Sequence, residues 1–392
     1  MKNNNLNLSD LRQPNTIAMA GANNYNENSG QQYLAMGASL PLLEGLEFGL
    51  NATFVDYGCS QGAASVAVMQ HLVARLRPHS VATLVFNDLP SNDFDSLIKL
   101  LPKIRPTEPT AKIYPCIIPS SFYNSVMPPD SVDLGFALSS IHWMRQMPEP
   151  KLDTQSFEEY LRVREIHNLA AAHKDLVEFL DLRGQEIKQG GKLIVAVPCP
   201  CVDDNDGRIT GNGKLRRALF RGMEILISQG RLPTNATARI LPPTHVHTEQ
   251  SFLAALNETK TAWKIEKVYS RVIPHQAYPA MLEAQNKTQD PEIKKIHGKE
   301  YASKMVDFIS AVFKPFMQAW WIEQGLDREI SEQVFLECAE LAKIDFVNGG
   351  GVNYPVAQDY PHRAFDSYSL TEGYSQNFMV ATSGFESSYC IA

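Results

Sequence analysis

The chain has 392 residues, of which 44% are apolar and 20% are charged, a composition typical of a globular protein and not of a disordered one. Its 36 basic and 43 acidic residues give a formal net charge of −7, and no dense run of lysine or arginine offers a footprint for nucleic acid or an anionic membrane. Six scattered cysteines without zinc-site spacing predict free thiols in a reducing compartment. The first residues lack the apolar core of a signal peptide, and no apolar stretch approaches the ~20 residues of a membrane span, so we expect a cytoplasmic protein.

Short apolar runs predict strands that alternate with helices along the first half of the chain. The expected strands are residues 53–57, 81–86, 131–138 and 192–197, with a further one at 261–272, and the expected helices are 63–75 and 157–187. Continuous hydrophobicity in the second and fourth runs is typical of strands that are covered on both faces. The alternation predicts an α/β fold with a parallel sheet built from right-handed crossover units.

The pattern changes beyond residue 200, where helical periodicity dominates. Residues 215–228 and most of 275–345 are expected to be helical, and the apolar face of the latter includes Phe308, Val312, Phe316, Trp320 and Trp321. We therefore expect a division into three parts. These are an α/β ligand-binding domain (residues 17–200 plus 241–274), a helical cap (202–240 plus 275–345) and a C-terminal tail (346–392) rich in Gly, Ser and Tyr.

A glycine turn follows the first predicted strand, where residues 55–62 read Val-Asp-Tyr-Gly-Cys-Ser-Gln-Gly. Ligands of parallel sheets bind outside the carboxyl ends of the strands, and a glycine there lets the backbone approach a ligand closely. Three residues separate Gly58 from Gly62, so the turn is not the Gly-x-Gly-x-x-Gly dinucleotide motif. A cofactor with a zwitterionic amino-acid tail fits this turn better than a pyrophosphate, although a purely structural glycine turn is the alternative.

Asp88 and Ser139 stand at the ends of two further predicted strands, which places them beside Gly58 at the same crevice. A carboxylate can accept two hydroxyl hydrogen bonds, so Asp88 is a candidate for binding a ribose. The alternative is that Asp88 caps a helix that begins near Pro90.

Five motifs occur in order over residues 21–197. They are Tyr25, Asn28, Ser29 and Gln32 at fixed spacing; Asn-Asp-Leu-Pro-Ser-Asn-Asp-Phe at 87–94; Ser-Phe-Tyr at 121–123; Ser-Ile-His-Trp-Met-Arg-Gln-Met-Pro at 140–148; and Gly-Gly-Lys at 190–192. This set resembles the SABATH family of methyltransferases, whose members methylate salicylic, benzoic and related acids as well as xanthine alkaloids. The resemblance implies S-adenosylmethionine as cofactor and a Rossmann-like class I methyltransferase sheet with an added helical cap.

The resemblance also implies a set of cofactor-binding residues. Ser29, Asp56, Gly58 and Ser60 would hold the methionine part, Asp88 the ribose hydroxyls and Leu89 one face of the adenine, while Ser121 and Phe122 would border the adenine from the other side. Ser139 is a further cofactor-binding candidate because of its place at the crevice, although the family commonly has an aromatic residue at that position. Some members hold a metal with polar residues that the segment 239–243 lacks, so we expect no metal. Relatives in the family suggest a homodimer.

The substrate implied by the resemblance is a small carboxylic acid. Gln32 and Trp143 would donate hydrogen bonds to its carboxylate, and Tyr25 and His142 would line the same pocket. An acid with a pKa near ~4 is already ionised at neutral pH, so no general base is required, and the protein has to align oxygen and methyl carbon and exclude water. Neutral donors suit this task because they position the carboxylate without a strong salt bridge that would lower its nucleophilicity.

Three other functions stay open at this point. The enzyme could methylate nitrogen or a phenol oxygen, in which case His142 could hydrogen-bond the acceptor. It could also be a non-catalytic regulatory protein that binds the cofactor. A nicotinamide-dependent oxidoreductase is disfavoured because the dinucleotide motif is missing.

Overall fold

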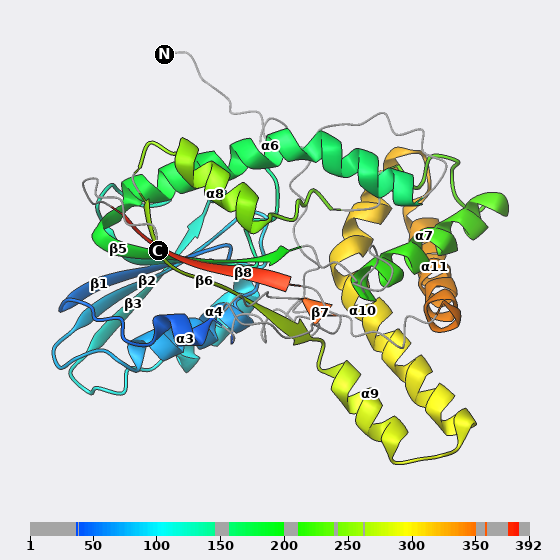
Figure 1. Cartoon of the computed structure of the whole chain (residues 1–392), viewed down its shortest axis with the longest axis horizontal. Helices are drawn as coiled ribbons and strands as arrows, with labels where there is room; N and C mark the ends of the chain where they lie inside the picture. The colour runs from blue at the N-terminus through cyan, green and yellow to red at the C-terminus, as the bar shows by residue number, and fades with distance from the viewer. Residues whose placement is uncertain are drawn as a thin grey trace.

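The computed structural model describes most of the chain, although Tyr25, Ser29 and Gln32 lie outside the described residues. The described residues are 37, 39–145, 157–199, 211–238, 242–261, 263–349, 357–358 and 375–383. They form a twisted sheet with helices on both faces, and a separate group of helices at one end of it (Figure 1). Within these ranges, no helix combines the length and the apolar character that crossing a bilayer would require.

Among the described residues, eight strands form one sheet in the order β3-β2-β1-β4-β5-β8-β6-β7. Their bounds are β1 (Asn51–Tyr57), β2 (Val81–Asp88), β3 (Lys112–Pro119), β4 (Val132–Leu138), β5 (Ile187–Cys199), β6 (Trp263–Pro274), β7 (Ala357–Gln358) and β8 (Ser375–Ser383). Strands β1 to β5 pair in parallel, and β8 pairs antiparallel with both β5 and β6. The predicted parallel α/β sheet is confirmed.

Helices cover both faces of the sheet, because the central strands carry apolar side chains on both faces. Their bounds are α3 (Leu40–Leu43), α4 (Ala63–Val73), α5 (Phe94–Leu100), η2 (Leu101–Lys103), α6 (Phe157–Glu186), α7 (Gly211–Ser228), α8 (Glu249–Glu258), α9 (Ala277–Asn286), α10 (Pro291–Glu323) and α11 (Arg328–Asn348). One apolar core packs α3, α4 and α5 under the sheet, and a second packs α6 and α8 over the opposite face (Figure 1). Strands β1 and β4 contribute side chains to both cores, which fixes the carboxyl ends of these strands between the two helical layers.

The remaining helices enclose a third apolar core of their own. Helices α7, α10 and α11 pack together beside the sheet, and α9 extends from them (Figure 1). Leu219 of α7, Met305 and Trp321 of α10 and Phe335 of α11 are all buried there. Of the apolar face predicted over residues 308–321, Trp321 is buried in this core and Phe308, Val312 and Trp320 pack against it partly buried. That this helical cluster caps the substrate is part of the proposal below.

Three of the described strands, β3, β7 and β8, are not anticipated by the sequence pattern. Strand β3 contains Pro115 and forms one edge of the sheet, where a missing backbone N–H is tolerated and the apolar signal is weak. Strand β8 comes from the tail, for which the sequence predicts no element, and it inserts between β5 and β6. Its pairing partners are distant in sequence, so local pattern could not indicate it.

Candidate active site

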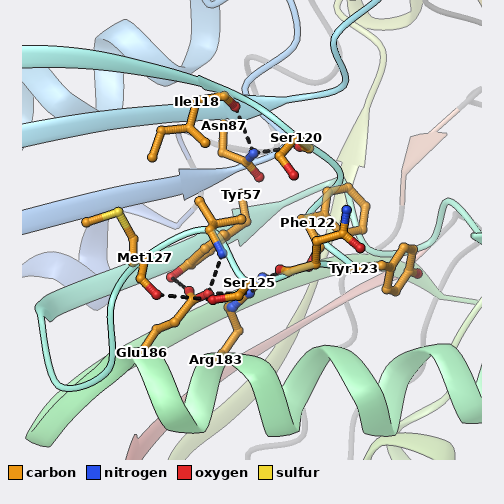
Figure 2. Close-up of polar contacts among 12 residues, drawn as sticks. Tyr57, Asn87, Ile118, Ser120, Phe122, Tyr123, Ser125, Met127, Arg183 and Glu186 are labelled. Carbon is orange, nitrogen blue, oxygen red and sulfur yellow. Dashed lines mark hydrogen bonds and ion pairs between the residues drawn. The ribbon is translucent and has the colours of Figure 1, made fainter. Parts of the chain in front are cut away.

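The carboxyl ends of β1, β2 and β3 are tied together by Asn87. Its backbone carbonyl accepts hydrogen bonds from the N–H groups of Gly58 (2.9 Å) and Cys59 (3.0 Å) at the start of the glycine turn. Its side-chain amide donates to the carbonyls of Ile118 (3.0 Å), near the end of β3, and Ser120 (2.7 Å), just after it (Figure 2). The turn after β1 and the loop after β3 are thus held on either side of the end of β2.

Gly58 takes a backbone conformation, φ +105°, that residues with a side chain rarely adopt. A Cβ atom at this position would lie 2.3 Å from Cβ of Ser140, in the loop that follows β4. The Ser140 hydroxyl in turn donates a 2.6 Å hydrogen bond to the carbonyl of Tyr57. The glycine is therefore required first by the close approach of two loops of the protein itself.

We expect Gly58→Ala to lower the melting temperature and to abolish cofactor binding, because both the backbone strain and the clash would push the turn away from Ser140. Gly190→Ala is the matched control, since Gly190 also has a positive φ, +78°, but a Cβ atom added there would have no neighbour within 4 Å. Differential scanning fluorimetry and calorimetric titration with S-adenosylhomocysteine check the result. Equal losses in both variants would show that strain alone matters and that the contact with Ser140 does not.

Asp88 lies at the end of β2 with both carboxylate oxygens turned toward neighbouring backbone. Oδ2 accepts from the N–H of Ser60 at 2.6 Å, and Oδ1 accepts from the N–H of Leu89 at 2.7 Å. Each oxygen has a second lone pair that can accept a hydroxyl. The alternative role as a helix cap is wrong, because the next helix, α5, begins at Phe94 and is capped by Asp93.

Asp56 is buried, and its Oδ2 atom has no hydrogen-bond partner among the described residues. The hydroxyl of Ser60 is also enclosed and has no partner there. Burial, and secondarily the charge of Asp88, raise the pKa of Asp56 to about 7 against a hydrogen bond from Ser65 that lowers it. Buried polar atoms without partners are rare in folded proteins, so this carboxylate and hydroxyl are suited to a polar, cationic ligand.

Arg183, which lies near the end of α6, holds the loop after β3 in place. Its guanidinium is fully buried and donates to the carbonyls of Phe122 (2.7 Å) and Asn124 (3.0 Å) (Figure 2). It also lies 4.2 Å from the ring centroid of Tyr57. This arrangement fixes the backbone of Phe122, one of the residues predicted to border an adenine.

Glu186 balances the charge of this buried arginine. Its carboxylate lies 2.9 Å from Nη2 of Arg183 and accepts hydrogen bonds from the Tyr57 hydroxyl (2.8 Å) and the Val126 N–H (2.6 Å). Burial raises the pKa of Tyr57, so its hydroxyl stays protonated and remains a donor. Sequence reasoning missed Arg183 and Glu186, because an arginine and a glutamate three positions apart in a long helix usually face solvent.

His142 and Trp143 follow β4 and are joined to a second segment, residues 242–247. The Met144 N–H donates to the carbonyl of Pro243 (2.7 Å), and the His245 N–H donates to the carbonyl of His142 (2.8 Å). The Trp143 ring stacks on Phe316 of α10, with centroids 5.7 Å apart and 28° between the planes. These two of the predicted substrate residues thus lie where the sheet meets the helical cluster.

Three histidines gather here, although the sequence pattern predicts only His142. Burial first, and the charge of Arg216 second, lower the pKa of His142 to about 3. Burial is also the main cause that lowers the pKa of His245 to about 4 and that of His247 to about 3. All three imidazoles are neutral at physiological pH, and the His-x-His spacing at 245–247 was the signal in the sequence that could have drawn attention to them.

The structure therefore brings most of the predicted residues to the edge of the sheet where its parallel strands have their carboxyl ends. Those at the ends of β1, β2 and β4 or in the loop after β3 are Asp56, Gly58, Ser60, Asp88, Leu89, Ser121, Phe122, Ser139, His142 and Trp143. The Tyr123 hydroxyl links the two halves of this group by donating a 2.7 Å hydrogen bond to the carbonyl of Trp143. The contacts of Tyr25, Ser29 and Gln32 stay predictions.

Comparison with known proteins identifies relatives of this arrangement. A family model described as SAM dependent carboxyl methyltransferase matches residues 17–348. The chain is 27% identical over 315 residues to Methyltransferase FUS9 of Gibberella fujikuroi, a match that covers 78% of this chain and 84% of that protein. It is 30% identical over 245 residues to indole-3-acetate O-methyltransferase 1 of Arabidopsis thaliana, which covers 52% of this chain and 63% of that protein.

One solved structure is similar over nearly the whole fold. Loganic acid methyltransferase with SAH superposes with a TM-score of 0.65 at 17% sequence identity, and the match covers 94% of this chain and 98% of that one. At this identity the likeness concerns the fold, and it confirms the predicted Rossmann-like class I methyltransferase sheet.

Proposed function

The chain belongs to the family of S-adenosylmethionine-dependent carboxyl methyltransferases, and from this premise we propose that it transfers a methyl group to the carboxylate oxygen of a small organic acid. Membership confirms the resemblance to SABATH enzymes, and S-adenosylmethionine is the cofactor. The protein is thus a methyltransferase of small molecules. The acceptor atom and the role of each residue are the proposed part.

The residues around the glycine turn fit this cofactor. The partnerless oxygen of Asp56 and the enclosed hydroxyl of Ser60 would hold the charged methionine end. The remaining lone pairs of Asp88 would accept the two ribose hydroxyls, with Leu89 and Phe122 on the faces of the adenine. When bound, the cofactor supplies a sulfonium whose methyl group is electrophilic.

The match to a family of carboxyl methyltransferases carries the choice of a carboxylate, and the lowered pKa of His142 supports it. A residue whose pKa is lowered to about 3 is too weak a base to remove a proton from a phenol or an amine cation. The same holds for its buried neighbour His247. A carboxylic acid needs no such base, because it is already ionised, so this group suits an acceptor that arrives as an anion.

The proposed task of the protein is alignment. The indole N–H of Trp143 would donate to the carboxylate, and stacking on Phe316 would keep the indole plane fixed. Gln32 would supply a second neutral donor. The reacting oxygen would attack the methyl carbon in line, the carbon–sulfur bond would break, and its electron pair would stay on sulfur, which becomes the neutral thioether.

We expect Trp143→Phe to lower kcat/KM for the acid about tenfold to hundredfold, since one hydrogen bond to a charged group is lost while the stacked ring is kept. The affinity for S-adenosylhomocysteine should stay the same. Steady-state kinetics over a panel of aromatic, terpenoid and aliphatic acids, with calorimetry of cofactor binding, check both points. If xanthines or phenols turn over and every acid fails, the carboxylate assignment is wrong.

A further inference from the structure

Arg216 lies on α7 and faces the residues proposed to contact the substrate. Its guanidinium carbon lies 5.8 Å from the ring centroid of Phe313, one turn before Phe316 on α10. Phe316 in turn stacks on Trp143, whose ring centroid is 5.7 Å from that of His142. The positive charge of Arg216 contributes to the lowered pKa of His142, after the larger effect of burial. Arginine, two phenylalanines, tryptophan and histidine thus form one group, which we call the aromatic group.

Within the part of the chain that the structure describes, no carboxylate is paired with Arg216. Its Nε atom is enclosed by protein and has no hydrogen-bond acceptor there, a feature that it shares with Arg164 and Arg183, which donate through their other nitrogens. By contrast, Arg221, further along the same helix, lies 3.6 Å from Asp345, and Arg164 donates to the carbonyls of Pro242 and Thr244. Burying part of a guanidinium without an acceptor costs free energy unless a ligand supplies one.

The aromatic group contains no second charge, because its histidine is neutral. A ligand anion that lies beside Phe313 would therefore be balanced by Arg216, whose planar fork matches a carboxylate with two parallel hydrogen bonds. The reacting carboxylate is a poor candidate for this partner, since a bidentate salt bridge would hold the electron pairs that must attack the methyl group. The anion that Arg216 suits is a different one on the same molecule.

We propose that the natural substrate is an acid with a second anionic group, most simply a dicarboxylate, and that Arg216 binds the carboxylate that is not methylated. This inference rests on the proposed function for the identity of the first carboxylate. It makes Arg216 a specificity-determining residue that would select diacids over their monoacid counterparts.

The test measures binding, so that it does not depend on turnover. Calorimetric titrations would use the protein loaded with S-adenosylhomocysteine. The probes are terephthalate and the α,ω-dicarboxylates from succinate to sebacate, each beside its monomethyl ester. We expect at least one dicarboxylate to bind more tightly than its ester by about tenfold to hundredfold, the contribution of one charge-assisted contact. Arg216→Met should remove this preference and leave the affinity for the ester unchanged.

Arg221→Met is the matched control, because it removes a cation from the same helix without touching the aromatic group, and it should keep the preference for the diacid. The proposal is overturned if Arg216→Met retains the preference, if it weakens diacid and ester alike, or if no dicarboxylate in the series exceeds its ester. Methyl transfer to the monomethyl esters, each with one free carboxylate, is measured separately. Its absence would count against the proposed function, whereas binding that depends on Arg216 would still support the anion site.

Discussion

Replacing Asp56 with asparagine is expected to weaken S-adenosylhomocysteine binding at about pH 7.5 by about tenfold to hundredfold, the loss of one charge-assisted contact in a buried site. The side chain keeps its size, so the turn after β1 should stay folded. Burial raises the pKa of Asp56 to about 7, and a ligand ammonium would favour the ionised form. Below this pKa the site must lose a proton before it binds a cation, so the affinity of the unmodified protein should fall about tenfold for each pH unit.

The pH dependence separates this role from a structural one. Calorimetry between about pH 5.5 and about pH 7.5 should show the slope in the unmodified protein and a flat profile in Asp56→Asn. A raised carboxyl pKa also means that the folded state loses stability as pH rises from 3.8 toward about 7, because the folded state then holds more protons than the unfolded one. Asp56→Asn lacks this cost, and its melting temperature at about pH 7.5 should rise. A slope that persists unchanged in the variant would assign the titration to another group, such as Asp88.

Arg183→Met is expected to lower the free energy of unfolding by about 3–5 kcal/mol, because it leaves the carboxylate of Glu186 buried without its cation. The Arg183 and Glu186 side chains are 0% and 2% exposed, so solvent cannot take the place of the missing partner. The carbonyls of Phe122 and Asn124 lose their donor as well. The loop after β3 should loosen, and cofactor affinity should fall together with stability. Urea denaturation and calorimetry measure the two effects.

An exposed ion pair gives the contrast for this prediction. Arg231 lies 2.9 Å from Glu337, and both side chains are 43% exposed. Arg231→Met should therefore change stability by less than about 1 kcal/mol. If Arg183→Met were no more destabilising than this control, the buried ion pair would not be what holds the loop.

The sheet and the cofactor residues could be predicted because their signals are local. A strand, an acid and a glycine turn follow each other within residues 53–62, and Asp88 ends the next apolar run. Parallel strands bring such ends together without further information, since their carboxyl ends share one edge. Gly58 has a second role that its local sequence does not indicate: the absent Cβ makes room for Ser140, a residue more than 80 positions away, in addition to any ligand.

The features that the sequence did not predict depend on contacts between distant segments. Strand β8 joins β5 and β6 from the far end of the chain, and the ion pair of Arg183 and Glu186 is buried only because the loop after β3 folds over it. His245 reaches His142 through a single antiparallel bridge between Trp143 and Thr244. Pairings of this kind have no local periodicity, and the charged or polar residues that make them are usually exposed.

The proposed chemistry is tested most directly by following the methyl group. The protein would be incubated with S-adenosylmethionine labelled on the methyl carbon and a panel of small acids that includes indole-3-acetate and dicarboxylates. Because a methyl ester is cleaved by alkali whereas methylated nitrogen and phenol ethers are not, mild base should release the label as methanol. We predict alkali-labile label that depends on the acid and is lost in Trp143→Ala. Label that withstands base, or no transfer to any acid, would contradict carboxyl methylation.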